Sequence, residues 1–167
     1  MRNTILGRLI IALFALSIMV SHGVALADPV EDSLAAYDRS DYATAVRLLR
    51  PLAEQGNARA QNGLGAMYYN GKGVAQDFKE AAKWYRLAAT QGYASAQVNL
   101  GAMYYEGQGV PEDFIRAYMW LSIAAAKGNA SAVQLRDTVA KYVIDQQIVE
   151  AQAMAHKCEA SHYKQCD

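Results

Sequence analysis

Cysteine and histidine are scarce in this sequence, and their scarcity limits the chemistry that the chain can perform. Only two of the 167 residues are cysteine, Cys158 and Cys166, and no histidine lies between Asp28 and Ala155. Metal centres in proteins draw heavily on these two side chains, and a general base is most often a histidine. We therefore expect no metal, no cofactor and no catalytic residue, and the chain is predicted not to be an enzyme.

An excess of charge of either sign is also missing. The 16 lysine and arginine residues balance the 16 aspartate and glutamate residues. Two of the basic residues lie before residue 28, so the remainder of the chain carries a net charge of −2. Nucleic acids attract proteins mainly through clustered positive charge. The composition therefore argues against a nucleic-acid partner.

The longest apolar run lies near the start of the chain. There a basic stretch, MRNTILGR, precedes the twelve-residue run LIIALFALSIMV and the small-residue motif ALA. This order predicts a signal peptide over residues 1–27 that is cleaved between Ala27 and Asp28. An uncleaved membrane anchor is the alternative, but a bilayer span needs about 20 apolar residues. We expect an exported protein, located in the periplasm or outside the cell.

The chain contains an internal repeat, in which LGAMYYNGKGV returns as LGAMYYEGQGV thirty-six residues later. Residues 58–93 and 94–129 align without a gap, with nineteen identities in thirty-six positions. The same register reaches back into a truncated unit, residues 28–57, and forward into an altered unit, residues 130–167, predicted to be a capping helix pair with a cysteine-containing tail. Repeats of this length are typical of stacked architectures whose terminal units cap the stack.

Each repeat unit predicts two α-helices. In the first, Leu64 and Met67 recur at helical spacing after Asn57, a capping residue. In the second, Ala81 and Tyr85 follow Asp77 in the same way. The glycines between the helices fit a tight turn, whereas a phosphate-binding loop would need the GxxxxGK[ST] spacing. No segment alternates strictly between apolar and polar residues, so we predict an all-α fold.

The repeated pattern, AxAQxxLGxMYYxGxGVxxDFxxAxxWxxxAAxxG, resembles the Sel-one-like repeat, a relative of the tetratricopeptide repeat. The match is firm over residues 58–129 and partial over residues 33–57. The resemblance implies a short right-handed α-solenoid of stacked antiparallel helix pairs with capping helices. It also implies a protein that binds other proteins, in a family with no activity common to all members.

The resemblance further suggests that the first helices of the units line the inner curve of the solenoid. Tyrosines on that face suit protein recognition, because they offer a large contact area and keep a hydroxyl group. Tyr69 and Tyr105 are the best contact candidates, although aromatic residues at this spacing can equally cover the packing between helices. The candidate partner-binding groove consists of Arg59, Asn62, Tyr69, Val98 and Tyr105.

Cys158 and Cys166 are predicted to form a disulfide, because exported proteins reside in oxidising surroundings. In a continuous helix their α carbons would lie about 12 Å apart, and a disulfide spans only about 4.4–6.8 Å. The helix must therefore break between Lys157 and Gln165. A metal site formed by Cys158, His162 and Cys166 is the alternative.

The sequence predicts a binding protein that acts without catalysis, as an adaptor, scaffold or regulator in the cell envelope. Its partner is expected to be another protein, such as an envelope or membrane sensor protein, and self-association is a second option. The alternative function is an enzyme that binds or hydrolyses β-lactams or cell-wall fragments, suggested by the SxxK spacing of Ser161 and Lys164. The chain has no S-D-N or K-T-G motif to accompany that spacing.

Overall fold

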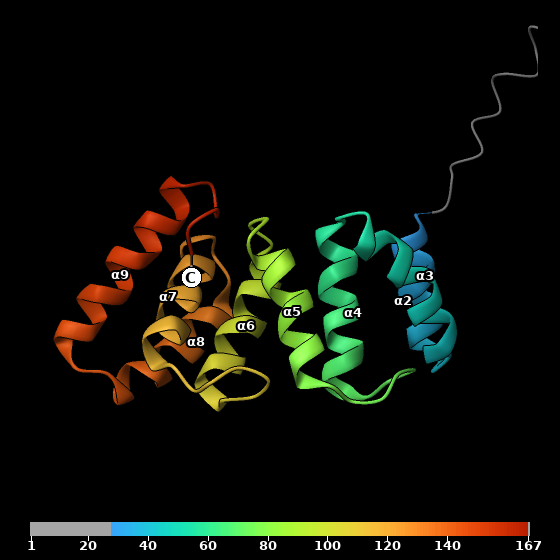
Figure 1. Ribbon diagram of the computed structural model, residues 1–167, viewed down its shortest axis with the longest axis horizontal. Coiled ribbons are helices and arrows are strands. Elements are labelled where there is room, and N and C mark those ends of the chain that lie inside the picture. The colour runs from blue at the N-terminus through green and yellow to red at the C-terminus, as the bar shows by residue number, and fades with distance from the viewer. Residues whose placement is uncertain (1–27, 167) are drawn as a thin grey trace, which may run out of the picture.

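The computed structural model of the protein describes residues 28–166, which form helices and no β-strand. The predicted signal peptide lies outside the described residues, as does Ala27 on one side of its cleavage site. The helices follow one another along the longest axis of the molecule, from α2 and α3 at one end to α9 at the other (Figure 1). The predicted all-α solenoid is confirmed.

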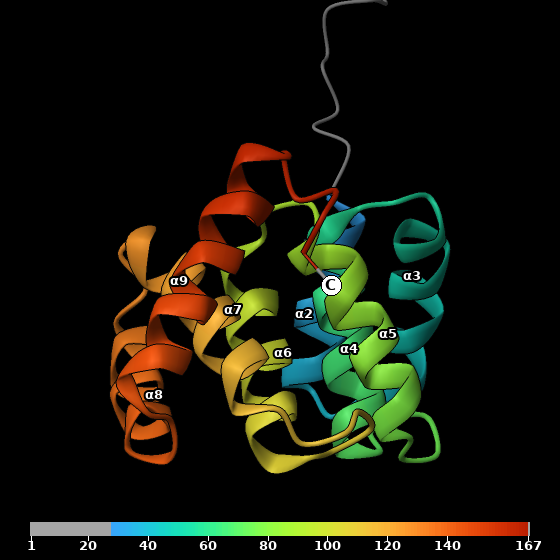
Figure 2. The same ribbon diagram turned by 60° about the vertical axis from the view of Figure 1, so that its left-hand side comes forward.

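Successive α-helices in the described part of the chain form three pairs and a closing cap. The pairs are α2–α3, α4–α5 and α6–α7, and both α8 and α9 pack against α7. Figure 2 brings α9 forward beside α7. No helix among the described residues is both long and apolar enough to cross a membrane. The elements are α2 (Pro29–Asp38), α3 (Tyr42–Glu54), α4 (Ala58–Asn70), α5 (Phe78–Ala89), α6 (Ala94–Glu106), α7 (Phe114–Ala126), α8 (Ala130–Val139), the 3-10 helix η1 (Ala140–Tyr142) and α9 (Asp145–Ala160).

The starts of α4 and α5 are fixed by the capping side chains that the repeat pattern predicts. Asn57 accepts a hydrogen bond from the backbone N–H of Ala60 at 2.9 Å. Asp77 accepts hydrogen bonds from the N–H groups of Lys79 and Glu80, at 2.9 and 3.0 Å. These carboxylate and amide oxygens satisfy N–H groups that the first helical turn leaves without a partner. Both predicted caps are therefore confirmed.

Buried polar contacts join neighbouring units at the repeat spacing. Gln61 on α4 donates its side-chain N–H to the carbonyl of Ala53 at the end of α3, at 3.0 Å. Gln97 on α6 makes the equivalent bond to Ala89 at the end of α5, at 3.1 Å. Both glutamines are buried, and Trp120 is fully buried in the core that the later units share. Each unit therefore packs directly against the next, as the stacked arrangement requires.

The glycine-rich turn of each full unit lies against the second helix of the unit before it. Gly73 and Gly109 have positive φ angles of 72° and 70°. A Cβ atom at Gly73 would overlap the backbone carbonyl of Tyr42, and one at Gly109 would overlap that of Phe78. Glycine is required at these two positions both for the backbone conformation and for the close approach.

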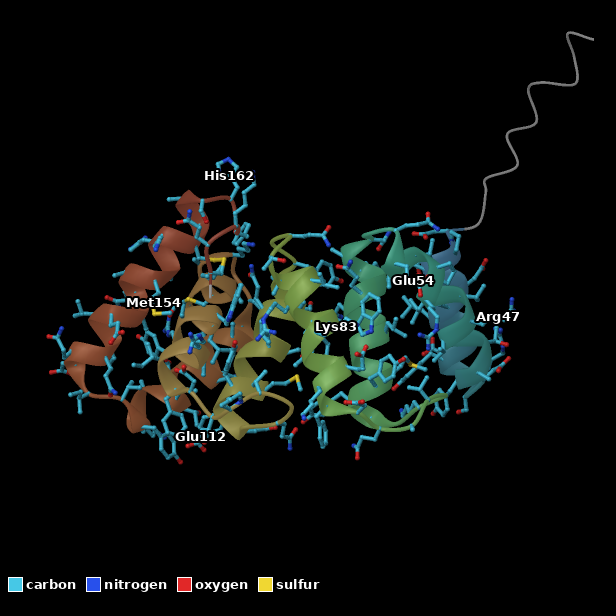
Figure 3. All side chains as sticks on the ribbon, viewed as in Figure 1. Arg47, Glu54, Lys83, Glu112, Met154 and His162 are labelled. Carbon is cyan, nitrogen blue, oxygen red and sulfur yellow. A yellow bond between two sulfur atoms is a disulfide. The ribbon has the colours of Figure 1, made fainter. Side chains whose placement is uncertain are left out.

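A disulfide closes the C-terminal end of the solenoid. Cys158 and Cys166 are joined, with their α carbons 4.5 Å apart, and α9 ends between them at the predicted break. The chain reverses through His162 and Tyr163, which have φ angles of 54° and 63°, and His162 points outward from the tip of this reversal (Figure 3). The ammonium group of Lys127 lies 4.6 Å from the centre of the Tyr163 ring. The tail is thus tied to the turn that follows α7.

Candidate binding face

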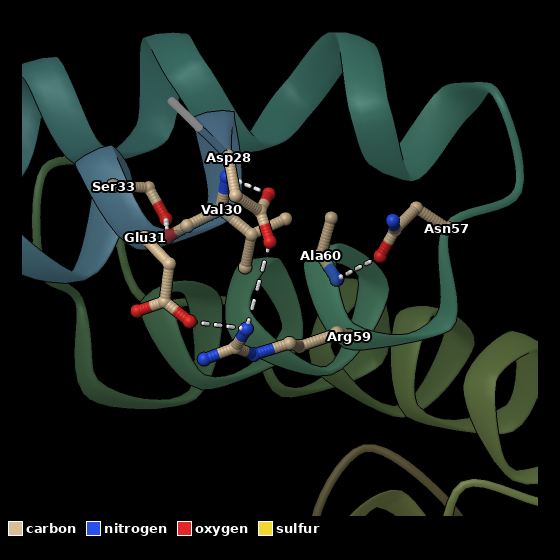
Figure 4. A network of polar contacts seen from close by, with 7 residues as sticks. All are labelled: Asp28, Val30, Glu31, Ser33, Asn57, Arg59 and Ala60. Atoms are coloured by element: carbon tan, nitrogen blue, oxygen red, sulfur yellow. Dashed lines mark hydrogen bonds and ion pairs between the residues drawn. The ribbon is translucent and has the colours of Figure 1, made fainter. Parts of the chain in front are cut away.

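Arg59, the first of the predicted groove residues, bridges the start of α4 to α2 (Figure 4). Its Nη1 atom lies 2.6 Å from Oε1 of Glu31 and 3.8 Å from Oδ2 of Asp28. The hydrogen bond with Glu31 raises the pKa of Arg59. Asp28 also caps α2 by accepting a hydrogen bond from the N–H of Val30. Because these ion pairs are open to solvent they add little stability, and the charges remain accessible to a partner.

A hollow of about 370 Å³ lies between α2 and α4, with part of α3 as its floor. Arg59 and Asn62 line it from α4, and Leu34 and Tyr37 line it from α2. The α2 side chains were not among the predicted groove residues. The first unit is truncated, and its match to the full repeats begins only at Asp41, so its first helix could not be aligned with theirs. The sequence feature that could have identified the α2 side of the hollow is Leu34, an apolar residue in a segment with acidic residues near both ends.

Asn62 on α4 is joined to α6, and Val98 lies on α6 one residue before Asn99, which makes this contact. The side chain of Asn99 donates a hydrogen bond to Oδ1 of Asn62 at 3.0 Å and so connects the two helices. Val98 is half-buried and packs against the core. Asn62 therefore belongs both to the hollow beside α2 and to the contact with the next unit.

Tyr69 lies further along the same face. Its hydroxyl group donates to Oε2 of Glu106 at 3.2 Å, and its ring meets the edge of Phe78 with the ring centres 5.2 Å apart. Burial, together with the charge of Glu106, raises the pKa of Tyr69. The ring also lines a second hollow of about 310 Å³ together with Asn99 and Ala102. Tyr69 thus contributes to packing while keeping one side open.

Tyr105 occupies the equivalent position in the next unit, at the end of the row of predicted residues. Its ring lies 5.9 Å from Phe114 and 5.6 Å from Tyr142 of η1. A hydrogen bond with Tyr142 is the main reason that the pKa of Tyr105 is raised. The five predicted residues therefore do not form one continuous groove. They occupy a row of three places along the first helices: the α2–α4 hollow, the α4–α6 contact and the aromatic cluster beside η1.

The first tyrosine of each YY pair has a structural role that sequence reasoning missed. Arg50 on α3 donates a hydrogen bond to the hydroxyl group of Tyr68 at 3.2 Å. Arg86 on α5 makes the equivalent bond to Tyr104 at 2.8 Å. The thirty-six-residue spacing of the two arginines was the signal for this pairing. The second tyrosine of each pair, Tyr69 or Tyr105, is then the one that lies on the first-helix face.

The C-terminal tail uses Ser161 and both cysteines within its own structure. The hydroxyl group of Ser161 donates to the carbonyl of Cys158 at 2.8 Å and accepts from the N–H of Gln165 at 3.0 Å, so it stabilises the turn after α9. Both sulfur atoms of Cys158 and Cys166 are used in the disulfide and are not available as thiolate ligands. Elsewhere among residues 28–166, no group of three or more metal-binding side chains is found.

Helix pairs that stack at a fixed spacing and present one face of first helices define an α-solenoid repeat protein. The sequence pattern of the Sel1 repeat matches residues 32–57, 58–93 and 94–129. The chain therefore belongs to the Sel1 repeat family, the family whose Sel-one-like pattern it resembles. Proteins built from this repeat are protein-interaction modules.

Two solved structures show the same architecture. A protective antigen present in uropathogenic Escherichia coli strains, which displays an SLR fold, is 31% identical with a TM-score of 0.74, covering 82% of this chain and 32% of the antigen. A Sel1 repeat protein from Oxalobacter formigenes is 34% identical with a TM-score of 0.61, covering 64% of this chain and 44% of the other. The chain thus spans less than half the length of either protein. No curated protein matches it.

Proposed function

We propose that the protein is exported and acts in the cell envelope as an adaptor, scaffold or regulator, by binding another protein through its first-helix face. The single observation that carries this proposal is the row of half-buried side chains along α2, α4 and α6. These residues combine aromatic rings, amides and an arginine on a scaffold of stacked helices. Aromatic residues and arginine are enriched at the centres of protein interfaces.

Export is supported by two independent features. The first residues have the order of charge, apolar run and small residues that signal peptides share. The disulfide between Cys158 and Cys166 is a bond that persists in oxidising compartments and is rare in the cytosol. Recovery of the protein from the envelope fraction, with Asp28 as its first residue by N-terminal sequencing, is the expected result. A cytosolic product that still carries residues 1–27 would reject export.

Affinity capture from envelope extracts tests the binding role. The wild-type protein is expected to retain one or a few specific proteins, and a Tyr69→Ala/Tyr105→Ala variant is expected to lose them. The matched control is Leu87→Ala/Val149→Ala, because Leu87 and Val149 are 41% and 57% exposed and neither lines either hollow of the face.

Three results would count against this proposal. Captured proteins that the tyrosine variant retains and the control loses would place binding on another surface. Specific retention of the protein itself, together with a larger mass by light scattering, would indicate self-association. Covalent labelling by a fluorescent penicillin that disappears in Ser161→Ala would favour the β-lactam alternative.

A further inference from the structure

The hollow between α2 and α4 is lined by a residue without a side chain, Gly63. Gly63 occupies the repeat position that Asn99 holds in the next unit. Asn99 extends a side chain that connects α6 to α4 through Asn62, whereas Gly63 has no side chain to reach α2. A Cβ atom at Gly63 would already lie 3.2 Å from the methyl groups of Leu49 in the floor. A side chain at this position therefore connects the two first helices in one unit, beside the hollow of about 310 Å³ that Asn99 lines, and no such connection is made in the other.

The hollow is apolar in its depth and has an exposed leucine beside it. Val30, Leu49 and Met67 line it and are only 3%, 5% and 2% exposed, so the core of the first unit fixes its shape. Leu34, by contrast, is 42% exposed. Ligand pockets in proteins start at about 300 Å³, and this hollow of about 370 Å³ is therefore of a size for one or two apolar side chains.

Acidic side chains surround this apolar opening. Glu31 and Asp38 lie three and four residues from Leu34 on α2 and so share its side of the helix. Asp28 and Asp32 add two further carboxylates, and α2 itself carries no basic residue.

Two cations on this side of the molecule, Arg59 and Lys72, are already engaged with side chains of α2. Arg59 binds Glu31 and Asp28. Lys72 donates to the hydroxyl group of Tyr37 at 2.6 Å and lies 4.5 Å from its ring centre. Arg39 follows Asp38 directly at the end of α2. The four carboxylates of this region therefore stand against three cations, Arg39, Arg59 and Lys72. The surroundings of the hollow keep a small net negative charge, with the exposed Asp32 and Asp38 outside the Arg59 ion pairs.

We propose that this hollow receives an apolar side chain from a partner protein segment that carries lysine or arginine on both sides of that residue. The inference rests on the binding function proposed above and adds to it the chemistry of the partner. The apolar residue fills the space over Leu49 and Met67 and covers Leu34. The flanking cations meet Glu31 and the other carboxylates of α2, which gives attraction at long range and orientation on contact.

Two peptides of equal length, KAKLKAK and EAELEAE, separate the charge requirement from the apolar one. Each is titrated into the ¹⁵N-labelled protein, and dissociation constants are obtained from the shifts of backbone amide signals. The lysine peptide is expected to shift signals of α2 and α4 around Gly63 and to bind at least tenfold more tightly than the glutamate peptide. Added salt should reduce this difference, because the carboxylates are exposed.

Two variants test the apolar part of the site. Leu34→Ser is expected to weaken binding of the lysine peptide about tenfold, and Leu87→Ser, a leucine of equal exposure on α5, is the matched control. Gly63→Ala places a methyl group against Leu49 and should weaken binding severalfold. Alanine favours a helix more than glycine does, but the contact with Leu49 is tight, so the urea midpoint of Gly63→Ala is compared with that of the wild type to separate weaker binding from loss of folding.

Equal or tighter binding of the glutamate peptide would overturn the inference, as would shifts centred away from α2 and α4. Unchanged binding in both Leu34→Ser and Gly63→Ala would do the same. These failures are distinguishable from failure of the proposed function. A captured envelope protein that depends on Tyr69 and Tyr105 but not on Leu34 would keep the binding role and reject only this hollow.

Discussion

The glycine-rich turn of each full unit packs against the unit before it, and this contact provides a direct test of the stacked architecture. Replacing Gly73 by alanine adds one methyl group at a residue with a φ of 72°, pointing at the backbone carbonyl of Tyr42. The carbonyl belongs to the first residue of α3, so the methyl group must push the turn of the second unit away from the first unit. Gly56→Ala is the matched control, since Gly56 has a φ of 93° and no atom within 4 Å of its Cβ position.

Comparing the two variants separates the energy of the left-handed backbone conformation from the energy of overpacking. A left-handed conformation costs a non-glycine residue roughly 1–2 kcal/mol, and this term applies to both. Overpacking against a fixed neighbour adds about 1–3 kcal/mol, and this term applies only to Gly73→Ala. We therefore expect losses in the free energy of unfolding of about 1–2 kcal/mol for Gly56→Ala and about 2–5 kcal/mol for Gly73→Ala.

Urea unfolding followed by circular dichroism measures this difference. With a urea m value of about 1–3 kcal/mol/M for a chain of this size, the two midpoints should differ by roughly 1 M. The m value should also fall for Gly73→Ala, because the first unit is expected to unfold before the others. Equal midpoints for the two variants would refute the idea that the turn nests on the preceding unit.

Three other changes should also alter stability. Replacing Cys158 and Cys166 by alanine should lower it by about 2–3 kcal/mol, because a short closed loop is opened, and a reducing agent should destabilise only the wild type. Gln97→Leu should cost about 1–3 kcal/mol by leaving the carbonyl of Ala89 without its buried donor. Burial raises the pKa of Tyr85 above its usual value, so its stabilising effect is complete below about pH 10 and declines at higher pH. Tyr85→Phe should therefore flatten the fall of the urea midpoint between pH 9.5 and about 11.5, and an unchanged slope would contradict this assignment.

The fold could be predicted in detail because its signals are local and are written twice. Local signals include the caps at Asn57 and Asp77, which bond to N–H groups within three residues. The positive φ of the turn glycine Gly73 is also a local requirement. Repetition then supplied the long-range information, since an identical spacing in two units implies identical packing. The break in the last helix followed from a distance limit on the bond between Cys158 and Cys166.

The candidate site could be predicted only in part, because its contacts join residues that share no pattern. The ring of Tyr142 comes from η1, outside the full repeats, yet it closes the cluster around Tyr105. Glu106 reaches Tyr69 across the unit boundary. Leu34 lies in the truncated unit ahead of Asp41, where the thirty-six-residue match begins. Placing these side chains required the three-dimensional arrangement of the first helices.

On α4 and α6, the positions at which the two full units differ lie outside the fully buried core. Residues that the units share, such as Leu64 and Leu100, are fully buried and fix the packing. Most of the differences on α4 and α6 fall instead on the exposed first-helix face, where packing allows several side chains. The exchange of Gly63 for Asn99 is the clearest case, because Asn99 connects α6 to α4 through Asn62 and Gly63 has no side chain to make such a contact. The proposed binding face therefore combines two kinds of residue: the shared tyrosines Tyr69 and Tyr105 and the unit-specific residues beside them. Substitutions of both kinds are needed to locate a partner on this face.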